Sequence, residues 1–456
     1  MLYEAESGDI QMALTGESLI CRKLSVYREE RFLKLRDMLR NADVTFGNAE
    51  CLFQDYSDPP NTYAGGGATG GTYMAAPPES VAELKWMGID IVSTANNHAS
   101  DFSDSGVLTN LKFLDQYGMA HAGTGNNLTE ACAPAYFDTP KGRIALLASA
   151  DWGPRGTGAQ PWPFPMGVMA GEQSPYSRGR PGCNLIRHHT KFTVNQEVFN
   201  AIQVMRKELG FDRVIGGGGR PSIGVDTEAE FTFMDSRIAL GSDFSMSTLP
   251  EQEDLELNYR WVRDARRNAD WVLYSFHNHG ATRSPELPSD HTRVVARGVI
   301  DNGADMFIGH GPHRDRGIEI YKGKPIFYSL GDFICQNGQV LWVPYDVMKR
   351  TGLGYENTPA DFHDARVAAG GIGSATGLGW ESVVVTLTYA KRQLKDIRLY
   401  PIDLGIGLPR SYNGRPVLAA AGNELNRRVL ERFQEMSKPY GTEIQIDNGV
   451  GIIHIS

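Results

Sequence analysis

Short apolar runs alternate with longer amphipathic segments along most of this chain, and this alternation limits the possible folds more than any other feature. The runs at 11–15, 88–92 and 271–276 are bounded by turn residues, as β-strands usually are. The segments between such runs carry apolar residues three and four positions apart, which is the spacing of a helix packed on a core. Strands that alternate with helices predict a layered α/β protein.

The same patterns predict the remaining elements. We expect strands at 11–15, 44–50, 88–92, 143–149, 271–276 and 306–308. We expect helices at 32–40, 77–87, 106–117, 194–209, 255–268 and 290–302.

Residues 151–243 depart from this regular pattern. They are rich in Pro, Gly, Trp and Arg, and long segments of this kind inside compact domains usually form lids or binding loops. We therefore expect an irregular insertion that acts as a lid or forms part of a pocket, although an oligomer contact is an equal alternative.

The composition excludes several classes of protein. The chain has 456 residues, of which 41% are hydrophobic and 22% charged, and this suits a globular protein with a sizeable core. A net charge of -9 argues against a nucleic-acid surface, which needs clustered Lys and Arg. The five scattered cysteines include no Cys-x-x-Cys pair, so we expect reduced thiols.

The N-terminus shows none of the features of a secretory signal, and no apolar run reaches the length of a membrane span. We therefore expect a soluble, cytoplasmic protein, and leave open whether it forms a homo-oligomer.

Five of the predicted strands are followed by polar residues that could bind metal ions. Each of these residues alone could cap a turn or pack in a core, so the prediction depends on their occurring together. Carboxylate, carboxamide and imidazole ligands suit Zn, Mn or Fe ions. The residues are Glu17, Glu50, Asn97 with His98, His277 with His279, and His310 with His313.

Several motifs of this chain resemble those of the CapA/PgsA family of capsule and poly-γ-glutamate biosynthesis proteins, and they occur in the same order along the sequence as in that family. The domain of that family is similar to the calcineurin-like metallophosphoesterases. The motifs are Gly47-Asn48-Ala49-Glu50, Ala95-Asn96-Asn97-His98, His279-Gly280, Ile308-Gly309-His310-Gly311-Pro312-His313 and Tyr328-Ser329-Leu330-Gly331-Asp332-Phe333.

The resemblance implies a four-layer α/β/β/α sandwich with two divalent metal ions at its strand ends. It implies one domain over 1–456, with the insertion at 151–243 and a C-terminal helix-strand extension at 405–456. The resemblance extends to a closing helix at 424–436 and a closing strand at 442–455 of that extension. By this resemblance, Glu17 replaces a metal-binding Asp, Glu50 bridges the ions and Asn97 is a ligand. His98 would donate a proton or stabilise an oxyanion, and the further ligands would be His279 or His277, and His313.

Three positions differ from the family pattern. Glu17 is one methylene longer than the usual Asp, and Asp332 replaces the usual Asn. Gly311 stands where a His is common, and His310 is displaced by one residue. A displaced ligand can still reach a metal from a loop, but Glu17 and His310 become the least secure of the predicted ligands.

We expect a metal-dependent hydrolase in which a metal-activated water attacks an amide, ester or phosphoester bond, with His98 as the catalytic residue. The expected substrate is small and anionic or glutamyl-like, with Arg314 and Arg316 as its binding residues. A plain surface role for Arg314 is about as well supported.

The alternative is a non-catalytic or assembly component of poly-γ-glutamate or capsule synthesis with a degenerate metal site. The departures at Glu17 and Gly311 favour it, whereas His98 and His279 oppose it.

Overall fold

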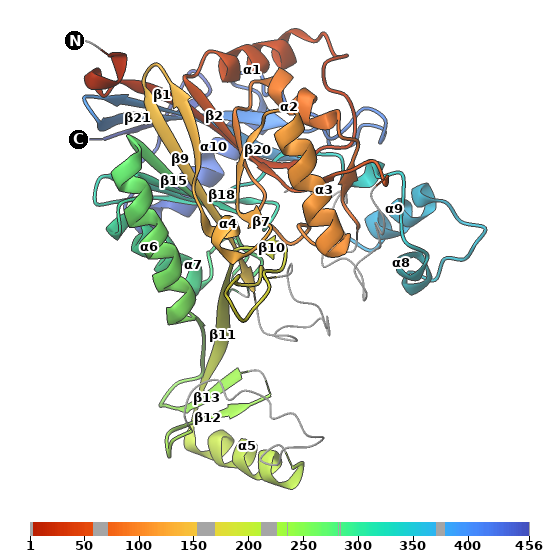
Figure 1. Cartoon of the computed structure of the whole chain (residues 1–456), viewed down its shortest axis with the longest axis vertical. Helices are drawn as coiled ribbons and strands as arrows, with labels where there is room; N and C mark the ends of the chain where they lie inside the picture. The colour runs from red at the N-terminus through yellow and green to blue at the C-terminus, as the bar shows by residue number, and fades with distance from the viewer. Residues whose placement is uncertain are drawn as a thin grey trace.

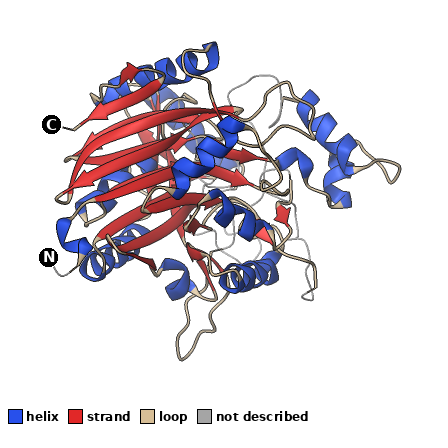
Figure 2. Ribbon diagram, turned by 90° about the horizontal axis from the view of Figure 1, so that it is seen from above, coloured by secondary structure: helices blue, strands red, loops and turns tan. Residues whose placement is uncertain are grey.

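The computed structural model describes residues 3–57, 72–152, 169–210, 226–234, 236–280, 282, 284–370 and 379–455. Residues 153–168, 211–225 and 235 of the expected insertion therefore lie outside the described residues. The described part contains two large mixed sheets and helices that pack on them, which confirms the α/β class (Figures 1 and 2).

The first sheet has ten strands. The strands follow one another in the order β23 (Gln445–Asp447), β24 (Val450–His454), β21 (Gln393–Asp403), β20 (Glu381–Ala390), β1 (Ile10–Leu19), β2 (Val44–Ala49), β5 (Ile91–Ser93) and β6 (Ala120–Ala122). In addition, β19 (Asp332–Cys335) pairs with β1, and β22 (Val417–Leu418) pairs with β21. Strands β1, β2, β5 and β6 are parallel to one another, so their carboxyl ends lie at one edge of the sheet.

The second sheet also has ten strands. The strands follow one another in the order β12 (Glu230–Phe233), β13 (Ser236–Leu240), β11 (Leu185–Val194), β9 (Gly142–Trp152), β15 (Trp271–His277), β16 (Met306–His310), β18 (Lys324–Leu330) and β17 (Asp315–Tyr321). In addition, β14 (Ser245–Pro250) pairs with β11, and β8 (Ala135–Thr139) pairs with β9. Strands β9, β15, β16 and β18 are parallel.

Two short strand pairs and the helices complete the described fold. The pairs are β3 (Leu52–Phe53) with β4 (Ala75–Ala76) and β7 (Thr124–Gly125) with β10 (Gly182–Cys183). The α-helices are α1 (Glu30–Arg40), α2 (Ser80–Met87), α3 (Ser103–Gln116), α4 (Leu128–Cys132), α5 (Gln196–Glu208), α6 (Gln252–Asn268), α7 (Asp290–Asp301), α8 (Tyr345–Arg350), α9 (Pro359–Ala368) and α10 (Glu424–Ser437). Short 3-10 helices span Glu4–Ser7, Asn337–Gln339 and Lys438–Tyr440.

The two sheets pack face to face around one central core. Met12 of β1 and Leu273 of β15 belong to the same buried cluster. Adjacent side chains of a strand point to opposite faces of the sheet, so Ala13, next to Met12, and Val272, next to Leu273, lie on the outer faces of the two sheets. Ala13 packs with α1, α2 and α3, whereas Val272 packs with α6 and α7. Helices therefore cover both outer faces (Figure 1).

Helix α10 packs against β17 of the second sheet and β21 of the first, and it closes one side of the central core. Its apolar face contributes Val429, Leu430 and Phe433, all fully buried. Arg432 on the same helix forms ion pairs with Asp315 of β17 and with Glu381 of β20. The C-terminal helix is thus fixed to both sheets.

Several predicted boundaries were wrong. The helix expected at 77–87 begins at Ser80, because the backbone forms turns in which Ser80 N–H and Val81 N–H donate to Pro77 and Pro78. The single strand expected at 442–455 is a hairpin of β23 and β24. Asn448 and Gly449 break it, since both adopt the positive φ that a tight hairpin turn requires.

The description of 151–243 as irregular was wrong for much of its described part. Strand β11 begins beside β9 and continues into a projecting lobe, where it pairs with β13 and β14 (Figure 1). The lobe has a small core of its own, which includes Phe199 of α5 and Phe231 of β12, with ring centroids 4.9 Å apart.

Strands β20 and β21 form a long antiparallel pair that the sequence patterns above did not predict. All five cysteines are free thiols, as expected. Within the ranges given above, the structure contains no helix that combines the length and the apolar character of a membrane span.

Candidate metal centre

The predicted ligands come together where the carboxyl ends of the two sheets meet. Glu17 lies within β1, which continues to Leu19, so the expected strand end at residue 15 was wrong. The pairing of β1 with β2 shifts register between Leu14 and Glu17, and this irregularity reorients the chain at the site. Gly16 is needed here, because a Cβ would collide with the carbonyl oxygen of Gly331.

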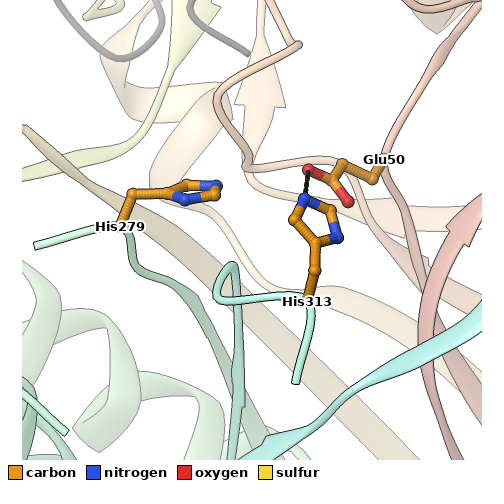
Figure 3. A group of neighbouring side chains, drawn as sticks. All are labelled: Glu50, His279 and His313. Carbon is orange, nitrogen blue, oxygen red and sulfur yellow. Dashed lines mark ion pairs between the residues drawn. The ribbon is translucent and has the colours of Figure 1, made fainter. Parts of the chain in front are cut away.

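Glu17 and Glu50 form a fully buried carboxylate pair surrounded by imidazoles. Glu17 Oε2 lies 3.9 Å from His277 Nδ1 and 3.7 Å from His313 Nδ1. Glu50 Oε1 lies 3.6 Å from His277 Nε2 and 3.6 Å from His313 Nε2. Figure 3 shows that His279 and His313 approach Glu50 from the second sheet.

Three oxygens of this pair, Glu17 Oε2 and both Glu50 oxygens, accept no hydrogen bond from any described residue. The remaining oxygen, Glu17 Oε1, accepts the N–H of Gly311 at 2.7 Å. Buried oxygens without donors are costly unless a cation or a hydrogen bond compensates them. The pair is therefore suited to bind positive ions.

The pKa values in the centre reflect this crowding. Burial and the neighbouring Glu17 raise the pKa of Glu50 well above its usual range. Burial raises the pKa of Glu17 as well, but the imidazole of His313 and its other partners outweigh this and lower it. Burial lowers the pKa of His279 to about 4 and that of His277 well below its usual value. Neutral imidazole is the form that binds metals.

His313 is held by a carboxylate that the ligand prediction missed. Its Nδ1 lies 2.8 Å from Asp332 Oδ1, and its backbone has a φ of 49°. Burial lowers the pKa of His313, but the charges of Glu17 and Asp332 outweigh this and raise it to about 9. Asp332 follows β18 after one glycine, so the pattern of polar residues after strands could have identified it.

His98 is placed to act beside the carboxylate pair. Its Nε2 is 4.0 Å from Glu50 Oε1, and its Nδ1 is 2.6 Å from Asp101 Oδ2. Burial raises the pKa of Asp101, and the interaction with His98 opposes this shift. Asn96 fixes the turn, because its Oδ1 accepts the N–H of His98 and its Nδ2 donates to the carbonyl of Ala49.

A second buried cluster supports His279 from behind. Asp151 Oδ1 accepts the N–H of His279 at 3.2 Å, and Asp151 Oδ2 accepts Asn278 Nδ2 at 2.8 Å. Asn278 Nδ2 also donates to His291 Nε2 at 2.7 Å. His188 stacks on His291 with centroids 3.8 Å apart and planes 11° apart.

Asp151, His188 and His291 are close enough to suggest a further metal site. Lone pairs of imidazole nitrogens lie in the ring plane, however, and two stacked parallel rings cannot both direct them at one ion. The cluster is better explained as a scaffold that fixes the 278–279 segment.

The structure places the other predicted residues as follows. His310 lies inside β16, beyond the expected strand end, and its ring packs beside Phe46. Asn97 is buried next to His98. Arg314 is partly buried directly after His313, and Arg316 is buried in β17.

Three overlapping groups of ligand atoms could hold metal ions. They are Glu50 with His279 and His313, Glu17 with Glu50 and His277, and Glu17 with His313 and Asp332. These groups consist of His, Cys, Asp and Glu ligands, and among the described residues His310 belongs to none of them. Mixed carboxylate and imidazole donors fit Zn, Mn or Fe, and the uncompensated oxygens fit a cation, so the residues present suit the expected ions.

Comparisons with known proteins agree with the motifs. The chain is 33% identical to the uncharacterized protein y4sH of Sinorhizobium fredii, over 97% of this chain and 93% of the relative. It is 36% identical to the PGA biosynthesis protein CapA of Bacillus subtilis, over 25% of this chain and 31% of the relative. It is 21% identical to the capsule biosynthesis protein CapA of Bacillus anthracis, over 73% of this chain and 59% of the relative.

The model of one protein family matches residues 7–337, a range that includes every residue of the centre. The resemblance to the CapA/PgsA family is thereby confirmed, and the chain belongs to the bacterial capsule synthesis protein family PGA_cap.

Proposed function

We propose that this protein is a metal-dependent hydrolase that cleaves an amide, ester or phosphoester bond of an anionic or glutamyl-like substrate. The observation that carries the proposal is the buried Glu17 and Glu50 pair, with three oxygens that no described residue compensates and with imidazoles less than 4 Å away. Two buried carboxylates side by side are unfavourable without cations. A dinuclear centre would resolve this conflict.

The likeness to the calcineurin-like metallophosphoesterases belongs to the same proposal. Two facing sheets with helices on both outer faces are what a four-layer α/β/β/α sandwich of that kind requires. The ligand groups lie at the carboxyl ends of its parallel strands, where α/β proteins place their sites.

Two divalent ions held by Glu17, Glu50, the histidines and Asp332 would supply Lewis-acid polarisation and water activation at neutral pH. The chain itself supplies the proton. The carboxyl of Asp101 fixes the orientation of His98, so that Nε2 faces the centre and can protonate the leaving group. The cluster around Asp151 holds the backbone of His279 in place.

Metal analysis of protein purified without chelator tests the proposal. We expect near-stoichiometric Mn, Zn or Fe in the wild type and its loss in a His279→Ala, His313→Ala double variant. Wild-type protein that contains no metal yet binds an oligomeric substrate would overturn it.

Two single variants test the division of roles. Asn97→Ala should lose metal or activity if its carboxamide is a ligand, whereas His98→Ala should keep metal and lose turnover. Identical behaviour of the two variants would contradict these roles.

A second candidate is a non-catalytic component of capsule or poly-γ-glutamate synthesis. Two relatives are named as biosynthesis proteins, and this observation favours an accessory role. In that case the centre would bind metal to hold the fold or a polymer, and His98→Ala would leave function in polymer synthesis unchanged. A cytoplasmic location belongs to the proposal in either case.

A further inference from the structure

Arg316 carries a guanidinium group that is buried in the folded protein. Its residue is only 4% exposed, and burial lowers its pKa to about 10. Its Nε donates a long hydrogen bond of 3.3 Å to the carbonyl of Pro285. Among the described residues, no carboxylate forms an ion pair with it. Arg guanidinium groups that are buried in proteins are normally paired, since an unpaired buried charge is costly.

A second guanidinium lies beside the first. Arg314 is partly buried two residues earlier in the chain, and its charge contributes to the lowered pKa of Arg316. Arg314 likewise forms no ion pair with a described residue. Two neighbouring like charges without a counter-ion repel each other, and this is unfavourable unless an anion joins them.

The nearby carboxylates do not complete this pair. Asp151 raises the pKa of Arg316, but the oxygens of Asp151 accept from Asn278 Nδ2 and the His279 N–H. Glu286 is exposed on the loop that contains Pro285, and it hydrogen bonds to Ser284. Both arginines lower the pKa of Glu286, after the larger effect of Ser284, so this carboxylate is near the pair without forming an ion pair.

We propose that Arg314 and Arg316 form an oxyanion-binding site next to the metal centre, which holds a carboxylate or phosphate group of the substrate. The role of this site in substrate cleavage rests on the proposed function, whereas the binding of an oxyanion by Arg314 and Arg316 does not. Guanidinium groups bind both oxyanions through paired N–H donors. Arg314 follows His313, and Arg316 neighbours the cluster that holds His279, so the anion would lie beside the reacting bond.

Calorimetric titration of the full-length protein with glutarate and with inorganic phosphate tests the site. We expect Arg316→Met to weaken binding of the preferred anion by roughly tenfold or more, because a charge-assisted hydrogen bond is lost. Arg316→Lys should give an intermediate loss. Tighter binding of glutarate identifies a carboxylate site, whereas tighter binding of phosphate identifies a phosphate site.

Two further variants keep the test informative if Arg316→Met folds poorly. Arg314→Met alters a partly buried side chain and should also weaken binding. Glu286→Gln removes a competing exposed carboxylate and should strengthen it.

A metal-depleted control separates this inference from the proposed function. Glu50→Gln, His277→Ala protein should lose metal and still bind the anion. If this control loses anion binding while Arg316→Met keeps it, the metal ions hold the anion and the inference is overturned. If wild-type protein contains no metal but needs Arg316 to bind the anion, the proposed function fails and the site stands. Equal affinity of the wild type, Arg314→Met and Arg316→Met would overturn the inference outright.

Discussion

The interaction between His98 and Asp101 offers a sharp test at the scale of single residues. Asp101 Oδ2 lies 2.6 Å from His98 Nδ1 and also accepts the N–H of Met74. We expect Asp101→Asn to lower turnover and leave metal content unchanged, because it disturbs only the orientation and proton position of His98. His98→Ala should lower turnover about 10²- to 10⁴-fold, as loss of a general acid usually does. Metal loss in Asp101→Asn would show instead that Asp101 supports the ligands.

The buried His291 predicts a pH dependence of stability. Burial lowers its pKa to about 3 in the folded protein, against about 6.5 for an unfolded histidine. Between these values the unfolded chain binds a proton that the folded chain does not. The free energy of unfolding should therefore be unaffected by His291 above pH 6.5 and fall by about 1.4 kcal/mol per pH unit below it. Urea unfolding from pH 7 to 5 measures the total slope, to which other buried histidines such as His188 contribute as well, and the change of this slope in a His291 variant gives the contribution of His291.

A His291→Gln variant should show a shallower slope than the wild type, even if its stability at pH 7 is lower. An unchanged slope would mean that His291 keeps a normal pKa in the folded protein.

Individual site residues could be predicted where chemistry and strand ends coincide. Glu50, His279 and His313 came from that pattern, and the structure brings them together. Asp332 obeys the same pattern, although the family motif identifies it only as a position where this chain has Asp in place of the usual Asn. Asp151 could not be identified, because its role depends on a backbone N–H 128 residues away in the chain.

At the scale of elements, strand β11 shows why the lobe was missed. It contains Arg187, His188, His189 and Lys191, so its polarity resembles that of a loop. Its stability comes from pairing with β9, β13 and β14, partners that a local pattern does not reveal. The helix α5 was predicted nearly correctly, since the spacing of its apolar residues is local.

The lobe should unfold locally when its small core is damaged. Phe231 is 1% exposed and packs on Phe199, and Phe→Ala changes in cores cost about 3–5 kcal/mol. We expect Phe231→Ala to accelerate amide hydrogen exchange in α5, β12 and β13 while β15 stays protected. Phe307→Ala, in the cluster beneath α6 and α7, is the matched control and should affect the second sheet. Equal loss of protection in both variants would show that the lobe and the body unfold as one unit.

At the scale of the whole molecule, the two sheets meet at the candidate centre. Each of its three ligand groups combines at least one carboxylate from a strand or strand end of the first sheet with at least one histidine from a strand or strand end of the second. An ion bound there would connect the two sheets at the carboxyl ends of their strands. Helix α10 also joins the two sheets, but it does so through apolar packing and ion pairs. This arrangement depends on contacts between residues far apart in the sequence. Local patterns therefore predict the ligands, but they do not predict which ligands lie together in one group.

Metal removal should therefore lower the stability of the entire protein. An ion that binds only the folded state stabilises it by about 2.7 kcal/mol when its free concentration is 100 times its Kd. We expect the melting temperature to rise with added Mn²⁺ and to fall after treatment with a chelator, in differential scanning calorimetry. The His279→Ala, His313→Ala variant should show much smaller changes, because two of the three ligand groups lose their imidazoles while both carboxylates and His277 remain. Equal stabilisation of this variant and the wild type by Mn²⁺ would place the ion elsewhere and remove the main support for a hydrolytic centre between the sheets.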